Sequence, residues 1–182
     1  MSVQAESRTN NVYPMRPQKK DYINYFDYYI NLIPEDTIIA ALKANHQSTL
    51  DFIEAIPRQK VNYFYDDGKW TVKQVVNHII DTERIFSYRA LRFARGDAQL
   101  LPSFDENVYA ANANLTETNM QLLMDEFDSV RLSTILLFKQ LSAKELLLKG
   151  HMTSGEVNVL SLGYMICGHT QHHLNIIKER YL

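Results

Sequence analysis

The chain contains few cysteine, glycine and proline residues, and each shortage excludes a class of protein. Cys167 is the single cysteine among 182 residues, so no internal disulfide can form. Low cysteine usage fits a reducing compartment, and we expect a cytoplasmic protein. Six glycines and five prolines are too few for the many turns of a β-sandwich.

Long apolar runs and an excess of positive charge are also missing. No run of about 18 apolar residues occurs, so the sequence predicts no segment that spans a membrane. The polar N-terminal stretch lacks the apolar core of a signal peptide. With 19 basic and 21 acidic residues and no large basic cluster, the chain offers no electrostatic reason to bind nucleic acid.

Hydrophobic residues, in contrast, recur at three- and four-residue spacing along most of the chain, which is typical of amphipathic helices. They make up 46% of the sequence, an ordinary share for one globular domain. We predict a flexible, polar tail over residues 1–18 and a single domain over 19–182. The predicted class is all-α, a four-helix bundle with long crossover connections. Its helices are expected over residues 21–57 with a break near Pro34, 72–94, 116–141 and 158–181.

Capping residues indicate where several of these helices begin. Thr71 is expected to cap the helix over 72–94, and Thr116 the helix that follows. Ser142 is expected to start a short helical turn. Between the helices, the sequence predicts an aromatic connection over residues 101–114 and an irregular excursion or short hairpin over 147–157.

The last predicted helix carries two histidines four residues apart, His169 and His173. Their imidazoles project from the same face of the helix, one turn apart, so both could bind one metal ion. Thr170 stands where the zinc-protease motif has its catalytic glutamate, so a metalloprotease is not expected. The face itself follows the rhythm of a bundle interior through Leu162, Ile166, His169, His173, Ile176 and Arg180.

A third ligand should come from a neighbouring helix, because two imidazoles alone hold a metal ion weakly. His78 is the best candidate, since it lies on the apolar stripe of the helix over 72–94. His46 also lies on an apolar stripe and is the main rival. His151, beside a glycine in the irregular segment, is less well held.

Three further residues lie near these histidines in the sequence. His172 is expected to face a neighbouring element or solvent, because it lies farther around the helix from His169 than His173 does. Asp81 could orient an imidazole from behind, or could pair with Arg84 or Lys73 on the helix surface. Cys167 is expected to be a small buried side chain.

Two motifs that contain these residues resemble those of the DinB/YfiT-like superfamily. The first spans residues 70–83, and the second is the Gly-His-Thr-Gln-His-His sequence of residues 168–173. The resemblance covers residues 36–182 and implies a four-helix bundle whose three histidines bind zinc, nickel or a similar divalent ion. On this chain the triad falls on His78, His169 and His173, which decides against His46.

The resemblance also implies a small-molecule enzyme. Members with known chemistry are similar to thiol S-transferases that use bacillithiol or a related thiol, and to a mycothiol-dependent isomerase; some were named for induction by DNA damage. A transferase is therefore expected, or a hydrolase if the ion holds a hydroxide. A homodimer is also expected, because amphipathic bundles often pair. The alternative is a non-catalytic, metal-stabilised binding module. Candidate substrate contacts around the aromatic connection are Arg89, Asp105, Glu106 and Tyr109.

Overall fold

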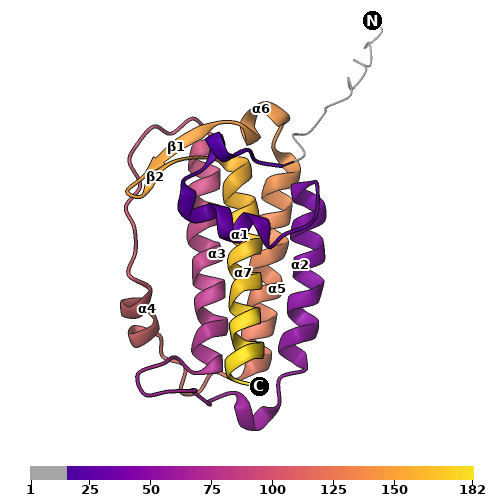
Figure 1. Ribbon diagram of the computed structural model, residues 1–182, viewed down its shortest axis with the longest axis vertical. Helices are drawn as coiled ribbons and strands as arrows, with labels where there is room; N and C mark the ends of the chain where they lie inside the picture. The colour runs from indigo at the N-terminus through magenta and orange to yellow at the C-terminus, as the bar shows by residue number, and fades with distance from the viewer. Residues whose placement is uncertain (1–15) are drawn as a thin grey trace, which may run out of the picture.

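Four long helices lie side by side and form the body of the protein (Figure 1). The computed structural model describes residues 16–182, so the first fifteen residues of the predicted tail lie outside the described part. The predicted four-helix bundle is confirmed. The helices are α2 (Ile38–Glu54), α3 (Val72–Ala94), α5 (Met120–Gln140) and α7 (Val159–Arg180). Among the described helices, none has the length and apolarity that crossing a bilayer would require.

The order of the helices around the bundle differs from their order in the chain. Both α5 and α7 pack against α2 and against α3. The helices α5 and α7 therefore lie diagonally opposite each other in the bundle, and so do α2 and α3. In Figure 1, α3 and α5 both run upward, and residues 95–119 return along the length of the bundle to join them. This return is the long crossover that two parallel neighbours require.

The connection between α3 and α5 contains a helix that the sequence pattern did not predict, α4 (Glu106–Asn112). The side chain of Asp105 caps it by accepting hydrogen bonds from the backbone amides of Asn107 and Val108. In Figure 1, α4 stands beside the lower half of α3. The aromatic stretch expected as a plain connection is therefore partly helical.

Two of the three predicted capping residues agree with the structure, and one was wrong. Thr71 caps α3 with a full capping box, and Ser142 does the same for α6 (Ala143–Leu146). The α5 helix, however, is capped by Asn119, whose side chain accepts from the amide of Leu122 at 2.8 Å, and not by Thr116. Lys73 explains the later start, because its ammonium binds the carbonyls of residues 115 and 118 and holds this segment outside the helix.

The predicted helix over residues 21–33 is only partly present. Two 3-10 turns, η1 (Lys19–Asp21) and η2 (Asn24–Phe26), precede a short helix, α1 (Asp27–Asn31). The α1 helix crosses the front of α7 rather than continuing into α2 (Figure 1). Gly168 permits this crossing: a Cβ atom there would lie 2.1 Å from the carbonyl oxygen of Tyr29.

The chain before α1 also packs on the domain. Arg16 donates hydrogen bonds to the carbonyl oxygens of Ile30, Ile33 and Glu35, at 3.0, 2.6 and 2.9 Å. Pro17 is buried. Residues 16–18, which the sequence assigned to the tail, therefore belong to the packed part of the protein.

Segment 147–157 forms the hairpin that was one of its two predicted outcomes. Strands β1 (Lys149–Met152) and β2 (Gly155–Asn158) pair antiparallel and lead directly into α7. Asn158, the last residue of β2, caps α7 by accepting from the amide of Ser161 at 2.8 Å. The hairpin closes the upper end of the bundle (Figure 1).

A buried ion pair divides the interior into two apolar clusters. The guanidinium of Arg131 donates to the carboxylate of Glu83 at 2.8 Å, and both side chains are inaccessible to solvent. The same guanidinium reaches Asn45 at 2.7 Å and Thr170 at 3.3 Å. These four residues come from the four long helices, so one polar centre joins all of them.

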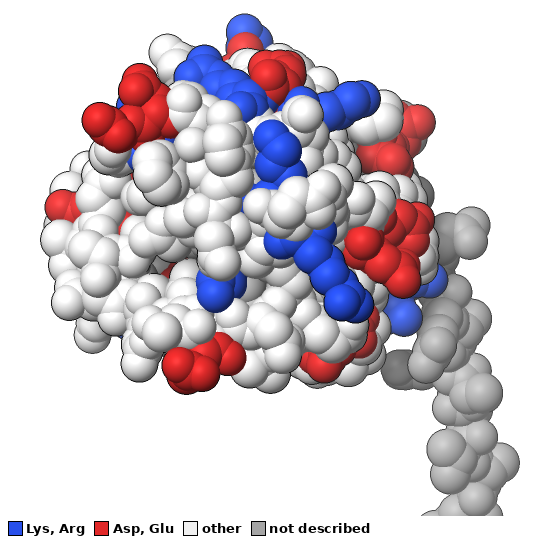
Figure 2. Space-filling view, turned by 90° about the horizontal axis from the view of Figure 1, so that it is seen from below, with Lys and Arg blue, Asp and Glu red and all other residues white. Residues whose placement is uncertain are grey.

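The lower end of the molecule carries both signs of charge. Figure 2 shows lysine and arginine side chains interspersed with aspartate and glutamate across this face, separated by uncharged residues. This mixture agrees with the nearly balanced totals of 19 basic and 21 acidic residues.

Candidate metal centre

The three predicted ligands converge on one point. His78 projects from α3, and His169 and His173 project from successive turns of α7. The Nε2 atom of His169 lies 3.1 Å from the Nε2 atoms of both other imidazoles. One potential ligand atom from each of the three side chains lies within 4.8 Å of the other two. Tetrahedral zinc with Zn–N distances of 2.0–2.1 Å separates its nitrogen ligands by roughly 3.3 Å, close to the two separations measured from His169.

Burial keeps these imidazoles neutral. It lowers the pKa of His78 to about 4, and together with the neighbouring histidines it lowers the pKa of His173 to about 3. The pKa of His169 is also lowered well below its usual range, first by burial. Neutral imidazoles offer lone pairs to a metal ion, whereas imidazolium groups do not.

The donor set fits a divalent metal ion. Three Nε2 atoms face one another, and one N–H can be shared between only two nitrogens at a time, so hydrogen bonding cannot satisfy all three. A cation at their centre would satisfy every lone pair at once. The Oγ1 atom of Thr82 lies 3.5 Å from Nδ1 of His78, on the other side of that ring.

The remaining histidines have other partners. Nε2 of His46 lies 2.7 Å from a carboxylate oxygen of Asp128, which removes this rival from the centre. His151 is exposed on β1. Nδ1 of His172 lies 3.3 Å from the hydroxyl of Tyr28, as expected for a residue that faces a neighbouring element.

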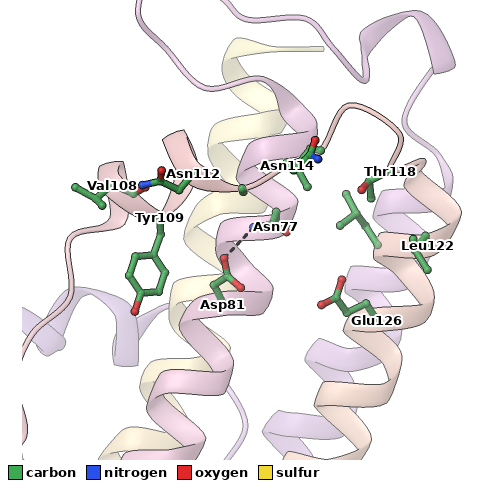
Figure 3. A pocket seen from close by; sticks show the side chains of 12 residues that line it. Asn77, Asp81, Val108, Tyr109, Asn112, Asn114, Thr118, Leu122 and Glu126 are labelled. Atoms are coloured by element: carbon green, nitrogen blue, oxygen red, sulfur yellow. Dashed lines mark hydrogen bonds between the residues drawn. The ribbon is translucent and has the colours of Figure 1, made fainter.

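Asp81 does not support an imidazole. Its carboxylate accepts a hydrogen bond from Asn77 at 2.8 Å and lies 3.9 Å from Arg84, so the pairing with Arg84 is the correct one of the two interpretations. Asp81 instead lines a cleft of about 510 Å³ between α3, α4 and α5, opposite Glu126 (Figure 3). We call it the second cleft, because a separate cavity lies over the histidines. Burial raises the pKa of Asp81 there.

A cavity of about 290 Å³ lies over the three histidines. Most of its wall is aromatic, and Thr82, Met165, Glu106 and His172 complete it. The sole tryptophan of the chain belongs to this wall, with its ring centroid 4.8 Å from that of His78. The aromatic residues are Tyr25, Tyr29, Trp70, Phe86 and Phe104.

Of the four candidate substrate contacts, only Glu106 lines this cavity. Asp105 caps α4, and Tyr109 faces the second cleft (Figure 3). Arg89 is buried, and its guanidinium donates to the carbonyl of Pro102 at 2.7 Å.

Sequence reasoning missed the tyrosines of the wall. Tyr25 and Tyr29 come from the segment around α1, and their hydroxyl oxygens lie 3.0 Å apart. Burial, and then the hydroxyl of Tyr25, raise the pKa of Tyr29, so its phenol stays protonated. The signal was the density of aromatic residues over 22–29, but nothing local in the sequence indicates that this segment crosses α7.

Comparison with known proteins identifies the family. A family model described as the DinB superfamily matches residues 41–177. The chain belongs to the DinB superfamily. The DinB match lies within the range over which the sequence resemblance was drawn, and it includes all three histidines.

Two similar proteins add detail to the DinB assignment. A protein of Oceanobacillus iheyensis, named as a candidate metal-dependent hydrolase, is 28% identical over 131 residues, which cover 69% of this chain and 73% of that protein. YfiT from Bacillus subtilis is described as a probable metal-dependent hydrolase with an unusual four-helix bundle topology. Its structure matches with a TM-score of 0.66 and 17% identity, covering 93% of this chain and 95% of that one. This second likeness shows that the two proteins share a fold.

Proposed function

We propose that this DinB protein is a hydrolase that depends on a divalent metal ion held by His78, His169 and His173. The observation that carries the proposal is the convergence of three desolvated Nε2 atoms on one point at the floor of a cavity. Three protein ligands are the usual number in catalytic zinc sites. Zinc or nickel is the expected ion, because both accept imidazole readily.

The ion, when bound, would act as a Lewis acid that polarises a substrate carbonyl and lowers the pKa of water. The protein supplies the rest. The α3 and α7 helices fix the three rings on a rigid platform, and Thr82 lies within reach of the Nδ1 atom of His78. Trp70 and Phe86 exclude water from one side, which strengthens electrostatic interactions within the cavity.

Glu106 is the candidate proton carrier of the site. Within the described part of the chain it is the one carboxylate that lines the cavity, and it is exposed at the rim, where it can exchange a proton with solvent. A carboxylate at such a position can pass a proton between the cavity and solvent.

Hydrolysis is preferred here to thiol transfer. Both similar proteins are described as metal-dependent hydrolases, and neither description mentions a thiol. The open cavity also favours an enzyme over a closed, purely structural metal site. Thiol transfer and a non-catalytic role are outcomes that the test below separates from hydrolysis.

The test begins with metal content. The purified protein should contain close to one divalent ion per chain by elemental analysis, and His169→Ala or His173→Ala should lose it while the far-ultraviolet circular dichroism spectrum keeps its helical form. His46→Gln is the matched control, because it also removes an imidazole but one that binds Asp128. Equal metal content in all four proteins would contradict the proposed ligands.

Activity is tested with the metal-loaded protein. A panel of small esters and amides should be hydrolysed, with the rate lost on chelation and restored by adding the ion. The same panel is repeated with added thiols. Turnover only with a thiol present would replace hydrolysis by transfer, and no turnover of any substrate by fully loaded protein would favour the non-catalytic module.

A further inference from the structure

The cavity over the histidines combines aromatic walls with a single carboxylate, and we propose that it binds an organic cation: an amine or quaternary ammonium group carried on an apolar body. The inference rests on the function proposed above, because it names the class of substrate for the same site. With about 290 Å³, the cavity is at the lower end of the range for small-molecule sites.

The charge of the cavity wall favours a cation over an anion. Among residues 16–182, no lysine or arginine lines the cavity, and Glu106 is the one carboxylate that does. The guanidinium of Arg89 lies 5.3 Å from the ring centroid of Phe86, but Arg89 is not among the lining residues, and it donates to the carbonyl of Pro102. A substrate with a carboxylate or phosphate at this end would find no guanidinium or ammonium partner.

The aromatic rim of the cavity also favours a cation. The ring centroids of Tyr25 and Tyr29 lie 5.4 Å apart, and Tyr25 is 65% exposed. The carboxylate of Glu106 and both of these rings line the same cavity. A tyrosine face attracts a cation through its quadrupole, and a nearby carboxylate adds charge attraction.

The inner wall suits the apolar body of such a substrate. Trp70, Phe86, Phe104 and Met165 line the cavity and offer dispersion contacts and apolar area. A molecule with a cationic head at the rim and an apolar stem would thus extend inward to the three imidazoles at the floor.

The test uses the metal-free full-length protein, so that an ion cannot attract anions and failure of the proposed hydrolase leaves the result readable. Benzyltrimethylammonium, which cannot ligate a metal, is compared with neutral benzyl alcohol and with benzoate. Calorimetry and the fluorescence of Trp70, the sole tryptophan, both report on the cavity. The cation should bind more tightly than either other probe, and Glu106→Gln should weaken its binding about fivefold.

Asp105→Asn is the matched control. It removes the same charge one residue away, outside the cavity, and asparagine still caps α4. It should leave binding of the cation unchanged, and both variants should keep the metal content of the parent when loaded. Equal loss in both variants would overturn the proposal, as would benzoate binding as tightly as the cation, or no saturable binding of the cation at millimolar concentration.

Discussion

At the residue scale, the buried imidazoles make the metal-free protein sensitive to acid. An unfolded histidine binds its proton near pH 6.5, whereas His78 in the fold does so near pH 4 and His173 near pH 3. Between these values the unfolded chain carries protons that the folded protein lacks, so unfolding is favoured as pH falls. Above about pH 6.5 this contribution to stability is complete.

The free energy of unfolding of metal-free protein should therefore decrease from pH 6.5 to pH 4, with His78 alone contributing about 3 kcal/mol. Urea denaturation at a series of pH values measures the slope. His78→Asn should reduce the slope by the equivalent of one proton. A slope identical to that of the parent would show that burial of this ring does not hold its pKa down.

Cys167 should be unreactive in the native protein. It is fully buried, and burial raises the pKa of its thiol to about 12. A reagent therefore cannot reach the sulfur, and the sulfur is not in its reactive thiolate form. Reaction with iodoacetamide, followed by mass spectrometry, should give no adduct in native protein and one adduct per chain in urea. Stoichiometric labelling without denaturant would contradict this burial.

At the element scale, Gly168 determines where α1 can lie. A Cβ atom at this position would meet the backbone of Tyr29, which cannot move aside as a side chain can. Gly168→Ala should therefore displace α1, lower the stability by about 1–3 kcal/mol and speed hydrogen exchange over residues 24–33. Metal content should be unchanged, because no ligand lies on α1.

Gly163→Ala is the control for this prediction. It makes the same change on the same helix, but the added carbon meets the side chains of Ile38 and Phe138 instead of backbone. Exchange over residues 24–33 should stay at the parent rate in this variant. Faster exchange in both variants would assign the effect to general loosening of α7.

The helices that could be predicted from the sequence are those defined by local signals. Helix α3 has Thr71 as its cap, and α7 starts where Asn158 caps it, so periodicity and capping sufficed. The delayed start of α5 depends on Lys73, which is distant in sequence, and the direction of α1 depends on contact with α7. Such long-range contacts leave no periodic trace in the segments that they control.

The same division applies to the candidate site. The meeting of His169 with His173 follows from helical spacing, and the apolar stripe around His78 pointed to the third ring. The tyrosines of the cavity rim, and the fact that Asp81 faces a different cleft, follow only from how helices pack against each other (Figure 3).

At the scale of the whole molecule, the Arg131–Glu83 pair joins the four long helices. Removing one member leaves the other charge buried without its partner, so Arg131→Met or Glu83→Leu should each cost about 3–5 kcal/mol in urea denaturation. The double variant should lose much less than the sum of the two, because no lone charge remains. Additive losses would mean that the two side chains do not depend on each other.

The distance in sequence between the ligands has a consequence for how the protein acquires its ion. His78 and His169 are separated by 91 positions, and His173 comes still later. No nascent chain that stops before His173 can present all three nitrogens, so loading must follow synthesis of nearly the whole bundle. An ion bound by all three histidines would link α3 to α7, which are synthesised at very different times during translation. Binding of the ion would therefore require that both helices are already packed against each other.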